Sequence, residues 1–252
     1  MNDLVRGPTA GPVPMVLRMS EIPYTVRRSA RARRARVEVS ASGVEVVVPR
    51  RMAARHAGEL VAEKRRWIER TLRRYQEAAR TGPAVRLEDG GGVPYLGRDL
   101  ALSVRVEPGR VRPRVRLDTG RDGVERLGLA VGAGGPEPIR AALEPWYRRR
   151  ADAEIGPRLS AAAARAGASY ARLVIRNQRT RWASCSSSGT MSFNWRLLLA
   201  PEAVLDYVIE HEVAHLAVPD HSRRFWTLLA ARCPAYREHE RWLRDHGPAL
   251  RL

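Results

Sequence analysis

Three histidines and a glutamate lie within eleven residues near the C-terminal end of the chain. Residues 211–215 read H-E-V-A-H, an H-E-x-x-H motif, and His221 follows six positions after the second histidine. Residues four apart share one face of a helix, so His211 and His215 can offer imidazole nitrogens to one metal ion. Glu212 lies about 100° around the helix from His211, where its carboxylate can reach a water beside the metal rather than the metal itself.

Three protein ligands with one open position are typical of a catalytic zinc site rather than of a closed structural one. The motif lies in an apolar run between Val204 and Leu216. There, histidines and a glutamate buried without a partner would be costly, and a metal ion supplies that partner. We therefore expect a metal-dependent hydrolase that binds one Zn²⁺ per chain, with water in the fourth position.

Prolines set the limits of the elements that must position these side chains. Pro201 suits the first turn of a helix, where its missing N–H costs nothing, and Glu202 complements the positive end of the helix dipole. Pro219 prevents the helix from continuing, so the chain can turn back and present His221. A second helix is expected directly afterwards, over residues 223–232.

The remaining pattern predicts an α+β fold. Long helices are expected over residues 52–80 and 137–166, with Pro145 and Pro157 as breaks in the second. The expected strands alternate in β fashion or are bounded by turn residues, and they lie within residues 24–49, 93–131, 170–175 and 191–197.

These elements predict three parts of the chain. Residues 1–19, rich in glycine and proline, are expected to be a disordered tail. Residues 20–135 are expected to form a β-rich N-terminal lobe with a long helix. Residues 136–252 are expected to form a helical lobe that carries the motif.

Composition limits the compartment and the partners. No apolar run approaches the roughly 18 residues that span a bilayer, and no apolar signal core begins the chain. Two cysteines cannot form a disulfide framework, and Cys185 is expected to be a packed structural thiol. These features predict a cytoplasmic protein without a membrane partner.

The net charge is +18, and all basic residues except Lys64 are arginine. Such a composition, together with abundant alanine, glycine and proline, is also typical of a GC-rich genome. The field attracts polyanions whatever its origin, so non-specific association with nucleic acid through the basic surface is one expectation.

Sequences on both sides of the motif resemble a known family. The strongest part runs from Arg179 to Trp226 and includes R-W-A-S-C-S at 181–186, N-W-R-L at 194–197, A-P at 200–201 and D-Y-V-I at 206–209. Weaker matches lie at 26–29, 44–49, 67–68 and 95–98. Together these segments resemble the YgjP-type metallopeptidase domain, which is related to the SprT-like and WLM-type zinc proteases.

The resemblance implies a zincin-like lobe in which His211, His215 and His221 bind zinc and Glu212 is the catalytic base. It also places a strand before the motif helix along the rim of the cleft, where an extended peptide can pair with its edge. One departure is Ala183, where the family usually has glycine; if that position has positive φ, alanine adds mild strain.

Two classes of substrate remain open. For a peptide substrate, Asn194 and Arg196 on the strand before the motif helix are candidate contacts. For a nucleotide substrate cleaved by a phosphohydrolase of the pyrophosphatase type, guanidinium groups near the metal would come from Arg176, Arg179, Arg181 and Arg196.

Two further interpretations concern a single residue and the whole chain. Tyr207 lies one turn before His211 on the same face, so it is a candidate hydrogen-bond donor to the substrate or a packing residue. A third interpretation of the whole chain is a basic, nucleic-acid-associated module with a structural metal. The open fourth position of the expected metal site argues against this interpretation. We favour the peptidase.

Overall fold

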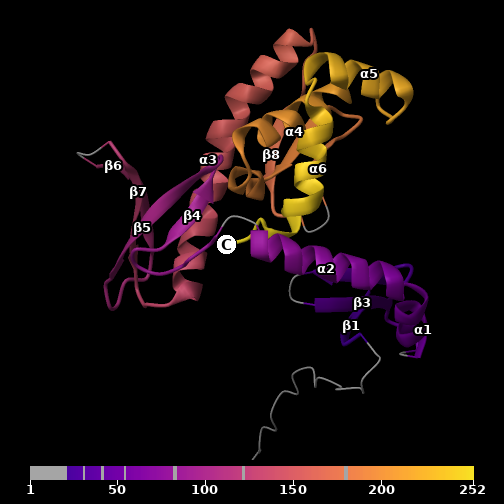
Figure 1. The fold of residues 1–252 in the computed structure, drawn as a ribbon, viewed down its shortest axis with the longest axis horizontal. Coiled ribbons are helices and arrows are strands. Elements are labelled where there is room, and N and C mark those ends of the chain that lie inside the picture. The colour runs from indigo at the N-terminus through magenta and orange to yellow at the C-terminus, as the bar shows by residue number, and fades with distance from the viewer. Residues whose placement is uncertain are drawn as a thin grey trace, which may run out of the picture. The chain divides into compact units, whose positions relative to one another are not determined.

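The computed structural model describes residues 22–30, 32–40, 43–53, 55–81, 84–120, 123–178 and 181–252. The described residues form an α+β fold, drawn in Figure 1, and the expected tail of residues 1–19 lies outside them. The chain divides into two compact units, Met1–Arg80 and Thr81–Leu252. No helix among the described residues is long and apolar enough to cross a bilayer.

The N-terminal unit is a three-stranded sheet with two helices on one face. The strands β1 (Tyr24–Ser29), β2 (Arg36–Ser40) and β3 (Gly43–Pro49) have the order β1-β3-β2, in which β1 is parallel and β2 antiparallel to β3. Alternate valines of β3 pack against α1 (Arg55–Glu63) and α2 (Arg65–Thr81). The one long helix expected here is divided at Lys64, although its i to i−4 hydrogen bonding continues through that residue.

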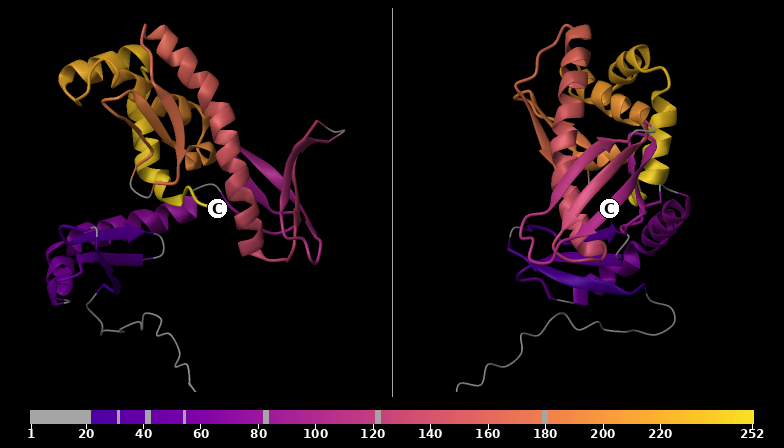
Figure 2. Two further views of the ribbon diagram at one scale, coloured as in Figure 1. Left: turned by 180° about the vertical axis from the view of Figure 1, so that it is seen from behind. Right: turned by 90° about the vertical axis from the view of Figure 1, so that its left-hand side faces the viewer.

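The C-terminal unit begins with a sheet that packs on one long helix. The strands β4 (Gly92–Tyr95), β5 (Arg98–Val106), β6 (Arg114–Thr119) and β7 (Glu125–Val131) have the order β4-β5-β7-β6. Their apolar side chains share one core with α3 (Pro136–Arg165), which Figure 2 shows alongside the sheet.

Two expectations for this region differ from the structure. Pro145 and Pro157 lie inside α3 without ending it, because buried side chains on both sides of each proline hold the helix in place. The boundary between the two compact units falls between residues 80 and 81 of the chain, whereas the sequence suggested a lobe boundary at residue 135. The physical reason is that the apolar face of the β4–β7 sheet is covered by α3.

The elements around the histidine motif follow α3. A second sheet has the order β8-β10-β9, and its strands are β8 (Arg172–Arg176), β9 (Ala183–Cys185) and β10 (Thr190–Asn194). The helices after β10 are η1 (Trp195–Leu199), α4 (Glu202–Ala214), α5 (Arg223–Arg232), α6 (Tyr236–His246) and η2 (Gly247–Ala249). The helix expected over residues 223–232 is confirmed as α5.

The expected strand over residues 191–197 ends early, at Asn194. The side chain of Asn194 accepts a hydrogen bond from the backbone N–H of Arg196 at 3.2 Å and so caps the 3-10 helix η1. An asparagine cap therefore replaces the last part of the strand.

A turn between β4 and β5 fixes the approach to α4. Leu96 and Gly97 both have positive φ, at 50° and 85°, as the mirror-image turns of two-residue hairpins require. The N–H of Leu96 donates to the carbonyl of Leu198 at 2.8 Å, and a Cβ added at Gly97 would lie 3.4 Å from the Cα of Pro201. The turn thus lies against the start of α4.

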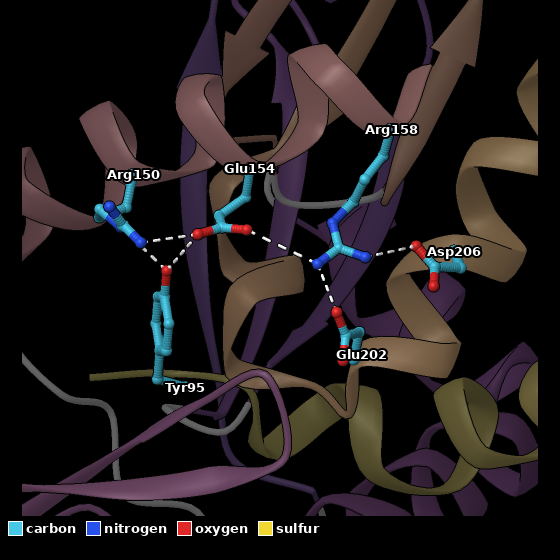
Figure 3. A network of polar contacts seen from close by, with 6 residues as sticks. All are labelled: Tyr95, Arg150, Glu154, Arg158, Glu202 and Asp206. Carbon is cyan, nitrogen blue, oxygen red and sulfur yellow. Dashed lines mark hydrogen bonds and ion pairs between the residues drawn. The ribbon is translucent and has the colours of Figure 1, made fainter. Parts of the chain in front are cut away.

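A polar network joins α3 to both neighbouring elements (Figure 3). Its members are Tyr95 of β4, Arg150, Glu154 and Arg158 of α3, and Glu202 and Asp206 of α4. The guanidinium of Arg158 donates to Asp206 at 3.0 Å and also contacts Glu202, while the hydroxyl of Tyr95 donates to Glu154 at 2.8 Å. Each charge has an opposite partner, so the network fastens α4 to α3 without leaving a charge unpaired.

Candidate metal centre

The three histidines of the motif converge in the structure. Each of His211, His215 and His221 offers one ring nitrogen, and these atoms lie within 4.8 Å of one another. The Nε2 atoms of His211 and His221 are 3.1 Å apart. Two nitrogen ligands of one tetrahedral zinc ion, each at ~2.0–2.1 Å, would be about 3.3 Å apart. The spacing therefore fits a single ion.

Contacts behind the imidazoles fix their orientation. The Nδ1 atom of His215 lies 3.1 Å from the carbonyl oxygen of Val218, and an N–H donated to that oxygen leaves Nε2 free for a metal. The ring of Phe225 is fully buried, and its centroid is 4.9 Å from that of His211, 4.5 Å from His215 and 4.8 Å from His221. Phe225 thus packs against all three imidazole rings.

Burial keeps two of the imidazoles neutral. Burial, together with repulsion from His215 and His221, lowers the pKa of His211 to about 4. Burial also lowers the pKa of His215. A neutral imidazole keeps the lone pair that a metal ion needs, so these rings are ready to bind one at neutral pH.

Glu212 is almost completely buried, with 6% of its surface exposed. Burial raises the pKa of Glu212 to about 7, and the backbone N–H of Cys185 in β9 opposes this rise. Its Oε2 atom is buried and has no hydrogen-bond partner among the described residues. A buried carboxylate oxygen of this kind needs a partner from outside the polypeptide, such as water or a metal ion, so it fits a metal centre.

The strand beside Glu212, β9, is an outer strand of its sheet in the described part of the chain. The backbones of Trp182 and Ser186 hydrogen-bond to the β10 side at 2.7 and 3.0 Å. Because these groups alternate along an antiparallel pair, the N–H and C=O of Ala183 and Cys185 point to the other side. The outer edge of β9 therefore faces Glu212. Ala183 has no positive φ, so alanine at this position adds no backbone strain.

The two candidate substrate contacts near the end of β10 are held by the protein itself. Asn194 is 2% exposed, and its amide donates to the carbonyls of Gln178 at 2.7 Å and Arg181 at 3.3 Å. The guanidinium of Arg196 contacts the Asn177 side chain and lies 4.8 Å from the centroid of the Trp195 ring. Asn194 thus ties Gln178 and Arg181 to the end of β10, and Arg196 ties Asn177 to η1.

Among the remaining arginine candidates, Arg176 lies toward the far end of this sheet. Arg176 pairs with Asn194, whereas Cys185, which contacts Glu212, pairs with Met191 three residues earlier. That separation along β10 is about 10 Å. Arg181 is exposed two residues before β9, and the position of Arg179 lies outside the described residues.

Tyr207 packs against the metal centre from behind. Its ring is buried and lies 6.0 Å from that of His211 in an edge-on arrangement. Burial raises the pKa of Tyr207. The residue also borders a cavity of about 460 Å³ that is lined by residues of α3 and α4 and by Arg232, Cys233 and His239.

Sequence reasoning missed the supporting groups around the motif. They are the backbone N–H of Cys185, the carbonyl of Val218 and the ring of Phe225. Of these, only Phe225 could have been recognised from the sequence, as an apolar residue one turn after His221. The N–H of Cys185 and the carbonyl of Val218 are backbone groups, so the pattern of side chains does not reveal them.

Two helix-borne histidines, a third histidine after a turn and a buried glutamate fit the pattern of a metal-dependent hydrolase site. The sequence model of the YgjP-like metallopeptidase domain matches residues 33–246. The chain therefore belongs to the YgjP-like metallopeptidase family, which confirms the resemblance seen in the sequence. Membership supports a metal-dependent peptidase as the class of enzyme.

No match to the chain is found among curated proteins. One similar solved structure is that of the metallopeptidase zymogen abylysin from Pyrococcus abyssi, which is 25% identical. The alignment covers 35% of this chain and 91% of that one, with a TM-score of 0.33.

Proposed function

We propose that this chain is a zinc-dependent peptidase with a zincin-like catalytic lobe. His211, His215 and His221 bind one Zn²⁺, and Glu212 is the general base. The observation that carries the proposal is the convergence of three histidine nitrogens within 4.8 Å, next in sequence to a buried glutamate. All-nitrogen ligation suits zinc, and three protein ligands leave one position for water or substrate.

Bound zinc would lower the pKa of a water molecule and polarise the carbonyl group of the substrate. Glu212 then takes a proton from the attacking water and passes it to the nitrogen of the leaving group. A pKa near neutral suits both transfers, because the carboxylate must gain and lose the proton in each cycle. The N–H of Cys185 keeps the carboxylate in place.

The position of β9 at the outside of its sheet supports a peptide as the substrate. An extended chain can add to this edge as a further strand through the outward N–H and C=O of Ala183. Such pairing would lay a peptide bond beside Glu212. The arginines that favoured a nucleotide substrate offer less support, since Arg176 lies about 10 Å along the sheet and Arg196 has partners in the protein.

Glu212→Gln tests the catalytic role. We expect this variant to keep its zinc and its fold but to cleave unfolded protein ~10²–10⁴-fold more slowly, because the base is lost. Glu210→Gln is the matched control: it makes the same change on α4, at a carboxylate that pairs with Arg165. It should retain nearly full activity. Wild-type turnover by Glu212→Gln would refute the proposed base.

Elemental analysis of protein purified without a histidine tag tests the metal. We expect one zinc per chain and much weaker zinc binding in His221→Ala. No metal after reconstitution with zinc, or unchanged affinity in His221→Ala, would overturn the ligand assignment. Release of phosphate or pyrophosphate from nucleoside triphosphates that depends on Glu212, without any peptide cleavage, would instead show a nucleotide substrate.

A further inference from the structure

Positive charge is concentrated in the N-terminal unit. Residues 1–80 hold 18 of the 45 basic and 8 of the 27 acidic residues, so they carry net +10 of the total +18. This unit is less than a third of the chain. Its local field will therefore attract polyanions more strongly than the average composition suggests.

Part of this positive charge lies along one face of α2. Arg66, Arg70 and Arg73 of α2 are exposed, and their spacing of four and three residues places them in one row. None of the three has an ion-pair or side-chain hydrogen-bond partner among the described residues. The opposite face of α2 is buried through Ile68. The row is thus a set of free guanidinium groups facing solvent.

Two arginines on the sheet of the same unit, Arg27 and Arg36, are ion-paired instead. Arg27 contacts Glu45 at 2.8 Å and Glu38 at 3.6 Å, and Arg36 contacts Glu38 at 2.8 Å. These guanidinium groups are neutralised within the unit. An arginine-rich composition alone would not separate paired arginines on the sheet from unpaired ones on the helix.

An exposed aromatic ring flanks the row. Trp67 is 42% exposed, and it is the one aromatic residue among the large hydrophobic side chains that are exposed in the described part of the chain. Basic side chains that follow a phosphate backbone, combined with an aromatic side chain on which a base stacks, are the usual elements of single-strand binding.

We propose that the α2 stripe, formed by Arg66, Trp67, Arg70 and Arg73, binds single-stranded nucleic acid. An anionic membrane fits less well, because the apolar face of α2 is already buried in the core and cannot enter a bilayer. A duplex would use the arginines alone, since its bases are stacked on each other. This site is separate from the proposed peptidase function and does not depend on it.

The test uses the full chain and a fluorescently labelled thymidine oligonucleotide of about 20 nucleotides, with anisotropy as the measure of binding. Changing the three arginines of the α2 stripe to glutamine should weaken binding roughly 10²-fold at ~0.1 M salt and lower the salt slope by about 2. Trp67→Leu should weaken binding of the single strand roughly 5- to 100-fold and leave binding of a duplex nearly unchanged.

A matched triple variant separates the stripe from net charge. Arg105, Arg114 and Arg116 are exposed on one face of the β5–β7–β6 sheet and have no ion-pair partner among the described residues. Their change to glutamine removes the same charge and should affect binding far less. Melting curves check that every variant is folded.

Three results would overturn the proposal. They are an equal loss of affinity in both triple variants, an oligonucleotide that does not bind at ~0.1 M salt, and a stripe that binds phosphatidylserine vesicles more tightly than the oligonucleotide.

Discussion

Phe225 holds the three imidazoles together, so its replacement should affect metal binding more than stability. Its ring is fully buried, and its centroid lies 4.5 to 4.9 Å from those of the three histidines. Phe225→Leu keeps an apolar side chain and should cost about 1–2 kcal/mol, less than the ~3–5 kcal/mol of truncation to alanine. The three imidazole rings then lose the aromatic side chain that they pack against, and loss of a group that orients metal ligands typically weakens metal binding ~10–100-fold.

Leu229→Ala is the matched control on the same helix. Leu229 is also fully buried and lies one turn after Phe225 on α5, farther along the helix from His221, and its truncation should cost about 2–5 kcal/mol. Zinc affinity is measured by competition with a chelator, and stability by urea denaturation of the metal-free protein. We expect Leu229→Ala to lose more stability yet to bind zinc normally, and Phe225→Leu to lose less stability yet to bind zinc ~10–100-fold more weakly. Affinities that simply follow stability in both variants would refute the reasoning.

Two further predictions concern the network of Figure 3. Arg158→Met removes the partner of Asp206 and should lower the free energy of unfolding by about 1–3 kcal/mol. Arg148→Met breaks only an ion pair within α3 and should lower it by about 0–0.5 kcal/mol. Equal losses of stability in urea denaturation would contradict this difference. Burial raises the pKa of Tyr95 to about 12, so above pH 10 the unfolded chain loses this proton first. Stability should therefore fall by up to about 2–3 kcal/mol between pH 10 and 12, and Tyr95→Phe should flatten that slope; the same slope in both proteins would show that Tyr95 is not its source.

The sequence predicted the parts of the site that local geometry determines. Spacings of four and six residues around a proline suffice to bring His211, His215 and His221 together, because a helix and one turn fix their relative positions. The order of the strands depends instead on pairing between distant segments. β10 reads as the strand before the motif helix, but β8 and β9 pair with its two edges, so it is central. β9 has three residues and no periodicity to reveal it.

The α4 helix meets a different neighbour on each of its faces. At about 100° per residue, Asp206 and Glu210 lie about 140° around the helix from His211 and His215. The acidic face contacts arginines of α3, at 3.0 Å for Asp206 and 2.7 Å for Glu210. The histidine face contacts Phe225, and Glu212 faces β9. Because these contacts lie on separate faces, substitutions on the α3 side should alter stability. Substitutions in α5 should alter metal affinity, and substitutions in β9 should alter substrate binding.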